Sequence, residues 1–134
     1  MKESSGWRKF FHQWGGGNAA FFAYVHFCHD MATGLMSAML PLVRQDFGLN
    51  YLESSLLVDV YAIISGLAQV GGGWLGDRAK RNVVAAIGLG GVGLTALGVS
   101  TSPTFFVMLV FMAMMGIFGG FYHPSSASLL TSYF

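Results

Sequence analysis

The chain has 134 residues, of which 54% are hydrophobic and only 10% are charged, and its formal net charge is +1. Soluble domains contain roughly a quarter charged residues, so this composition and a mean hydropathy of +0.57 predict a membrane protein. The near-neutral charge excludes nucleic-acid binding that relies on a basic field, and the single Cys28 excludes a disulfide within the chain.

Residues 1–17 are predicted to form a cytoplasmic amphipathic segment. Its aromatic residues follow the spacing i, i+3, i+4, i+7, and two basic residues lie beside them. They are Trp7, Phe10, Phe11 and Trp14, with Arg8 and Lys9. This pattern is typical of a helix that lies in the lipid headgroup layer and anchors the first membrane span.

Four apolar stretches follow, each close to the twenty or so residues that an α-helix needs to cross a bilayer. They run over residues 19–43, 52–75, 83–99 and 105–122, the last with a polar continuation. The polar breaks between them are short, so consecutive spans must be antiparallel. We therefore expect an all-α membrane protein with four transmembrane helices within residues 18–134.

Basic residues are strongly biased to one side of this expected topology. Only Arg44 falls on the other side. The remaining six are Lys2, Arg8, Lys9, Arg78, Lys80 and Arg81. Because cytoplasmic loops are enriched in Lys and Arg, we expect both termini in the cytoplasm and the chain in the cell inner membrane.

The first span contains the sequence HFCHD, at residues 26–30. On a helical wheel its polar residues share one stripe, which consists of His26, His29, Asp30, Thr33 and Ser37. A charged carboxylate at mid-bilayer costs at least ~2.5 kcal/mol, so this stripe must face a cavity or another helix.

Three hypotheses account for the stripe. Aspartate beside histidine can titrate near neutral pH, which suits proton coupling or substrate contact. The same residues could instead form a structural polar contact between helices. A metal site is the third hypothesis, although one short segment supplies only three ligands and no second Cys/His cluster exists.

Small residues in the next two spans predict close helix packing. Gly66 and Gly73 lie on one stripe of the second span. The third span contains Gly88, Gly90 and Gly93 in a G-x-G-x-x-G pattern, but no strand precedes it, so packing explains it better than dinucleotide binding. Asp59 in the second span is either a solvated carboxylate or a pathway residue.

The segment GGGWLGDRAKRN, residues 71–82, resembles the signature that the major facilitator superfamily carries between its second and third helices. Gly73, Asp77, Arg78 and Arg81 match it, whereas Lys80 and Asn82 depart from it. The resemblance implies a conformational switch loop. In relatives, the glycine packs against the other half of the protein and the aspartate faces a helix N-terminus there.

The first and fourth spans are similar to the fosmidomycin-resistance-like branch of that superfamily. His26, Phe27 and Asp30 match an HF-x-x-D pattern, and Tyr122, His123 and Pro124 match an aromatic-His-Pro pattern. Two positions differ from patterns in relatives, since Met112 replaces an arginine and Ser125 an acidic residue. His123 is thus either a cavity residue or a satisfied histidine in a proline-kinked helix.

This resemblance covers the first third of a twelve-helix transporter, so it implies the amino-terminal part of a six-helix half whose remainder is missing. The implied function is secondary transport, with proton-coupled export of a small organic compound or drug. The expected partners are the lipid bilayer, that substrate, protons and the remainder of the transporter. The candidate cavity residues are His26, His29, Asp30 and His123.

Two alternatives stay open. One is a self-contained four-helix exporter that acts as an oligomer, like the small multidrug exporters. The other is a membrane scaffold that transports nothing. The sequence contains no enzyme signature and no cofactor-binding motif.

Overall fold

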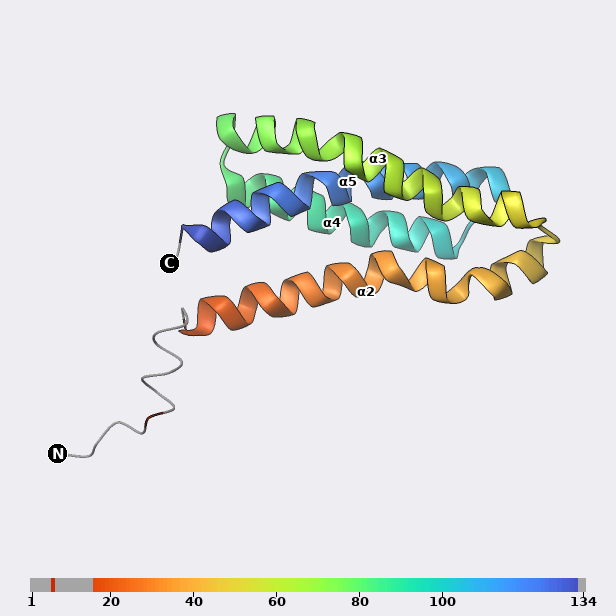
Figure 1. Cartoon of the computed structure of the whole chain (residues 1–134), viewed down its shortest axis with the longest axis horizontal. Helices are drawn as coiled ribbons and strands as arrows, with labels where there is room; N and C mark the ends of the chain where they lie inside the picture. Colours follow the sequence, from red (N-terminus) through yellow and green to blue (C-terminus); the bar gives the residue numbers. More distant parts are fainter. Residues whose placement is uncertain (1–5, 7–15, 133–134) are drawn as a thin grey trace.

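The computed structural model describes residue 6 and residues 16–132, and four long α-helices account for nearly all of the second range (Figure 1). They are α2 (Gly16–Phe47), α3 (Tyr51–Arg78), α4 (Arg81–Ser100) and α5 (Phe105–Thr131). The all-α prediction is confirmed, and each helix includes the span predicted for it. The predicted amphipathic segment, residues 1–17, lies outside the described residues except for residues 6, 16 and 17.

Three of these helices, α3, α4 and α5, are long and apolar enough to cross a membrane. The fourth, α2, is the longest at 32 residues, but it also carries the histidines and aspartate of the polar stripe. The apolar side chains at its surface, such as Phe27, Leu35 and Leu42, are more than half exposed. Lipid is the environment that such a surface requires.

Short turns join the helices in antiparallel order. Gly48 ends α2 with φ +63°, and the amide of Leu49 donates to the carbonyl of Arg44, which is the Schellman pattern of helix ends. Asn50 then starts α3, because its side chain and that of Glu53 form a reciprocal capping box. Only Ala79 and Lys80 separate α3 from α4.

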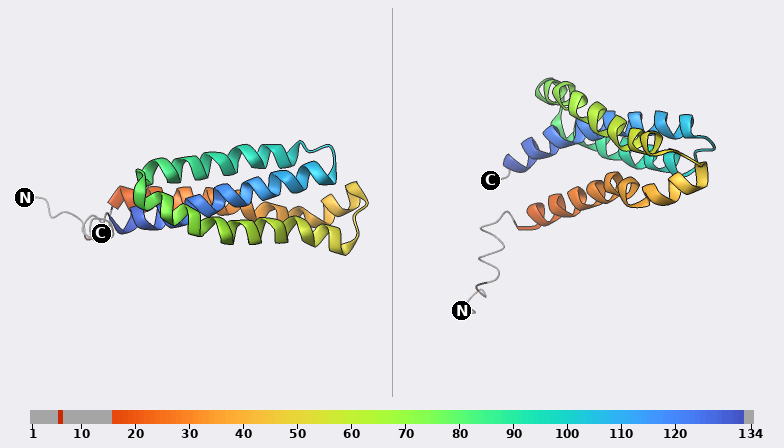
Figure 2. Two further views of the ribbon diagram at one scale, coloured as in Figure 1. Left: turned by 90° about the horizontal axis from the view of Figure 1, so that it is seen from above. Right: turned by 45° about the vertical axis from the view of Figure 1, so that its right-hand side comes forward.

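The central helix is α5, which lies between α3 and α4 (Figures 1 and 2). Its glycines bring the backbones into contact: a Cβ at Gly116 would lie 2.8 Å from the carbonyl oxygen of Tyr61, and one at Gly120 would lie 2.7 Å from that of Ser65. On the other side, a Cβ at Gly88 of α4 would lie 2.7 Å from the amide nitrogen of Tyr122. Small residues permit this close approach.

The predicted packing glycines are only partly right. Gly88 packs as predicted, but a Cβ added at Gly66, Gly73, Gly90 or Gly93 would meet no atom within 4 Å among the described residues. The face of α3 that meets α5 is instead one residue away from the predicted stripe and includes Gly72 and Gly76. Glycines lie on both faces of α3, so small residues alone do not identify the face that meets α5.

Each of the two helices that form the candidate site contains a proline. Pro41 lies in α2, which bends in its second half (Figure 1). Pro124 lies in α5, whose predicted polar continuation beyond residue 122 is helical as far as Thr131. Because proline lacks an N–H, the carbonyl of Gly120 has no helical partner. This carbonyl faces Gly72, where a Cβ would lie 2.7 Å from its oxygen.

In contrast to α5, helix α2 is held by few contacts. Its buried residues are His29 and Met36. In Figure 1 its first half runs apart from the other three helices, and its second half approaches them. The site therefore forms where a tightly packed helix faces a loosely attached one.

The glycine contacts generate a stability prediction. Gly120→Ala should destabilise the fold by about 1–3 kcal/mol, because its methyl group would overlap Ala68 and the backbone of α3. Gly66→Ala is the matched control. Its methyl group meets no described atom, so it should be neutral or stabilise the protein by up to about 1 kcal/mol. Unfolding in detergent micelles measures both, and equal effects would contradict the α3–α5 contact.

Candidate functional site

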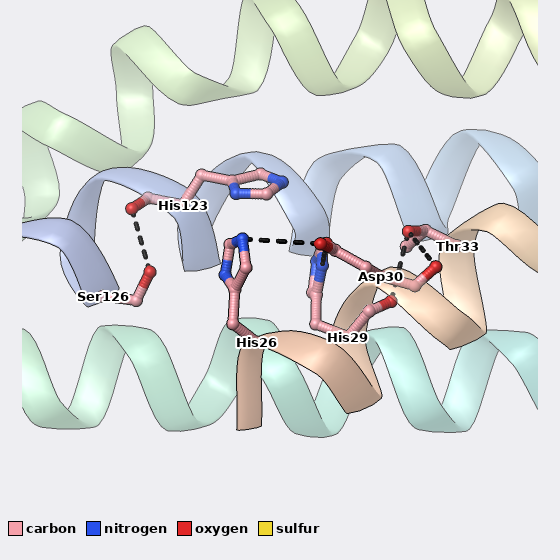
Figure 3. Close-up of polar contacts among 6 residues, drawn as sticks. All are labelled: His26, His29, Asp30, Thr33, His123 and Ser126. Atoms are coloured by element: carbon pink, nitrogen blue, oxygen red, sulfur yellow. Dashed lines mark hydrogen bonds and ion pairs between the residues drawn. The ribbon is translucent and has the colours of Figure 1, made fainter. Parts of the chain in front are cut away.

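The candidate site lies where α2 faces α5, and its residues come from positions more than ninety apart in the sequence (Figure 3). His29 stacks on Tyr122 with ring centroids 4.4 Å apart and an interplanar angle of 18°. The ring of His123 meets His29 edge-on at 4.7 Å. His26 completes the group, 5.7 Å from His123. We call His26, His29, Asp30 and His123 the His–Asp cluster.

The Asp30 carboxylate lies between two histidines of its own helix (Figure 3). Its Oδ2 is 3.5 Å from Nε2 of His26, one helical turn away. Its Oδ1 is 3.2 Å from Nδ1 of His29. The carboxylate therefore has a potential proton donor on each oxygen, which is the kind of pairing that a charge within a membrane requires.

Burial differs sharply within the cluster. The side chain of His29 is fully buried, whereas those of His26 and Asp30 are 49% and 57% exposed. All three residues lie on the predicted stripe, but only His29 is buried against α5. Thr33 supports this turn, since its hydroxyl donates to the carbonyl of His29 at 3.1 Å. The cluster thus combines a buried histidine, His29, with two accessible side chains, His26 and Asp30.

Two cavities flank the cluster along the helix axes. The larger, about 860 Å³, lies toward the start of α2 and the end of α5, and His26, Tyr122 and His123 line it together with apolar residues. The smaller, about 280 Å³, lies on the other side and is lined by Asp30, Thr33, Ser37 and Tyr61 among others. The histidines and the aspartate therefore lie between two cavities at different levels of α2.

The structure brings together all four predicted cavity residues, although their role is not thereby tested. It offers no support for the metal hypothesis, because no grouping of three or more His, Cys, Asp or Glu side chains in the described ranges is arranged to hold an ion. Asp59 is exposed on α3 and lines neither cavity. Sequence reasoning missed Tyr61, because a single tyrosine in an apolar span carries no signal of its own.

The predicted switch residues lie on helices rather than in a loop. Gly73, Asp77 and Arg78 belong to the last turns of α3, and Arg81 begins α4. Arg81 is 4.0 Å from the Asp77 carboxylate. The Asp77 side chain is 75% exposed, and no described atom approaches Gly73. This end of α3 therefore presents a glycine and a carboxylate on an open surface.

Comparison with known proteins identifies one family. The family model described as Major Facilitator Superfamily matches residues 22–134. No solved structure matches the chain significantly.

Individual relatives match over most of the chain. The multidrug efflux pump LfrA of Mycolicibacterium smegmatis is 29% identical over 75% of this chain and 20% of its own length. The uncharacterised MFS-type transporter YfnC of Bacillus subtilis is 22% identical, over 76% and 25% respectively. The tetracenomycin C resistance and export protein of Streptomyces glaucescens is 24% identical, over 67% and 17%. The chain thus spans a quarter or less of these curated relatives.

The stacking of His29 on Tyr122 predicts that the two side chains contribute jointly to the free energy of unfolding. His29→Ala and Tyr122→Leu should be non-additive in the free energy of unfolding by about 0.5–1.5 kcal/mol, because each variant removes the same ring contact. A double-mutant cycle in detergent micelles measures this. The control cycle pairs His26→Ala with Tyr122→Leu, whose rings are 5.9 Å apart, and should give a smaller coupling. Additive effects of His29 and Tyr122 would show that the two rings are not in contact.

Proposed function

Because this chain belongs to the Major Facilitator Superfamily, we propose that it is the amino-terminal part of a secondary transporter that exports a small organic compound or drug in exchange for protons. The family consists of membrane transporters, not enzymes. Two relatives are named for drug or antibiotic export, which supports export as the direction. In this proposal residues 18–134 supply the first four helices, and the remainder of the transporter supplies the other half.

The observation that carries the proposal is the position of the His–Asp cluster between the two cavities. A carboxylate in a membrane span costs at least ~2.5 kcal/mol unless it is paired or hydrated. Asp30 is paired, since two histidines contact it, and more than half of its side chain is accessible. We assign Asp30 the role of proton carrier. It takes up a proton from the space outside and releases it after the site opens to the cytoplasm.

The larger cavity suits an organic substrate. Phe22, Ala23 and Leu130 give it apolar walls, and His26 and His123 contribute polar groups. Binding pockets for small molecules combine these features: mostly apolar lining and a few polar groups that fix orientation. In the proposal, His26 contacts both the substrate space and Asp30, so a proton on Asp30 and a bound substrate can influence each other.

The switch role of Gly73, Asp77, Arg78 and Arg81 is likewise a proposal. Its support is the open space where a side chain at Gly73 would lie and the exposure of Asp77 at the end of α3, where a helix of the other half could pack on the glycine. The carboxylate would then complement the positive end of that helix. A charge contact of this kind forms in only one of two conformations, so it stabilises that conformation relative to the other.

We also propose the fosmidomycin-resistance-like branch within the superfamily. The two sequence patterns that suggest it, around Asp30 and around His123, contribute residues to the same cluster (Figure 3). Met112 is buried in the core where many exporters carry an arginine. Proton coupling in this protein would therefore depend on the cluster itself.

The proposal predicts the effect of neutralising the carboxylate. In cells that express the transporter containing this chain, Asp30→Asn should abolish proton-driven efflux of a fluorescent drug such as ethidium, because the amide cannot take up the transported proton. Counterflow exchange of labelled substrate in proteoliposomes should persist. The matched control is Asp46→Asn, at the exposed end of the same helix, which should retain efflux. Normal efflux by Asp30→Asn across the pH range would refute the coupling role.

A second prediction concerns topology. A reporter fused after Phe134 should be cytoplasmic, and one inserted between Thr101 and Thr104 should lie outside, because the basic residues at the α3–α4 turn favour the cytoplasm. Alkaline phosphatase and green fluorescent protein fusions distinguish the two sides. The reverse pattern would exclude the proposed orientation, and the same side for both reporters would exclude an α5 that crosses the membrane.

A further inference from the structure

The ring of His29 has one nitrogen with a partner and one without. Nδ1 lies 3.2 Å from the Asp30 carboxylate, whereas Nε2 is buried and has no hydrogen-bond partner in residues 16–132. Because a carboxylate accepts hydrogen bonds, the contact places the proton of a neutral ring on Nδ1 and leaves Nε2 as an acceptor. A buried acceptor without a donor costs about 1–3 kcal/mol. Nε2 therefore requires a donor from a neighbouring helix.

A suitable place for that donor exists beside Gly119 of α5. A Cβ at this position would lie 3.6 Å from Nε2 of His29, 3.2 Å from the hydroxyl oxygen of Tyr61 and 3.7 Å from Oγ of Ser65. Three polar atoms from α2 and α3 thus converge on a spot of α5 that carries no side chain. Any larger residue at position 119 would fill this spot and separate the histidine from the two hydroxyl groups.

Of the two hydroxyl groups, that of Tyr61 has the better position to act on the cluster. It is the closest of the three atoms to the Gly119 spot, and Tyr61 also lines the smaller cavity beside Asp30. Its hydroxyl hydrogen can rotate toward an acceptor. Ser65 is buried, one turn along α3, and can hold a bridging water at the same place.

We propose that Tyr61 is a positioning residue whose hydroxyl donates to Nε2 of His29 over Gly119, directly or through one water shared with Ser65. This hydrogen bond satisfies Nε2 as an acceptor and reinforces the tautomer that the Asp30 contact selects, in which Nδ1 carries the proton. Tautomers of histidine are commonly set in this way by the partner of the second nitrogen. The contact itself needs no assumption about transport, but its consequence for proton handling by Asp30 rests on the proposed function.

The test is ¹⁵N NMR of the chain with ring-labelled histidine in lipid nanodiscs, with His29→Gln used to assign the His29 signals. In the wild-type protein, His29 should show a single neutral tautomer with the proton on Nδ1. Tyr61→Phe removes only the hydroxyl group, so the ¹⁵N signal of Nε2 should move to the position of an acceptor without a hydrogen bond, whereas Nδ1 keeps its proton because Asp30 still accepts from it. Tyr24→Phe is the control. It removes a hydroxyl from an exposed tyrosine of α2 and should leave the His29 signals unchanged.

A second variant, in α5, tests the same contact between Tyr61 and His29. Gly119→Ala should shift the Nε2 signal of His29 in the same way as Tyr61→Phe, because its methyl group occupies the spot where the three polar atoms meet. Should this variant misfold, Tyr61→Phe still decides the question. Unchanged His29 signals in Tyr61→Phe would overturn the proposal. That result would leave the transport proposal standing, whereas normal efflux by Asp30→Asn would refute coupling and leave the tautomer result untouched.

Discussion

The backbone contact between α5 and its two neighbours determines the rest of the fold. In a bilayer the lipid tails are as apolar as the side chains, so helices associate through close packing and hydrogen bonds rather than through hydrophobic burial. Gly116 and Gly120 place α5 directly against the α3 backbone, and Gly88 does the same for α4. These contacts leave α5 little freedom to rotate or slide. The directions of Tyr122 and His123 are fixed as a result.

Once Tyr122 is fixed, it defines where α2 can dock. His29 is the one histidine of the cluster that is fully buried, and it is held from two sides by the rings of Tyr122 and His123. Asp30 follows His29 in the sequence, so it lies at the edge of the contact between α2 and α5 and remains more than half exposed. A structural helix contact and an accessible carboxylate therefore occur in adjacent residues. The sequence alone presented these as competing explanations, but the structure contains both.

Much of this arrangement was predictable from local patterns. The apolar runs identified the four helices, and the 3.6-residue period placed His26, His29 and Asp30 on one stripe. Helix ends were less accurate, because charged residues such as Asp77 and Arg78 were assumed to lie in a loop. A helix can carry such residues in its last turn, where they reach the lipid headgroups. The tight turn at Ala79 and Lys80 was therefore missed.

Other features depend on how helices meet, which no single-chain pattern encodes. Gly66 and Gly72 look alike in the sequence, yet only Gly72 contacts α5. Likewise, nothing local to Tyr61 or Gly119 indicates that they meet His29, since the three residues lie on three different helices. Their proximity follows from the rotation of α5 about its axis, and that rotation is set by the backbone contacts of the neighbouring Gly116 and Gly120.

Because α2 is loosely attached, a rotation about one of its buried residues would move the start of the helix more than its middle. Met36 and His29 are its two buried residues, and the capped turn at Gly48 ties down its far end. If the part of α2 that precedes Met36 turns about this residue as a rigid rod while the part beyond it stays in place, His29 lies ~10 Å from the pivot and Gly16 ~30 Å from it, at 1.5 Å per residue. A displacement of ~1 Å at the ring of His29 then becomes ~3 Å at the start of the helix. A small change at the stacked rings is thereby amplified into a widening at the mouth of the larger cavity.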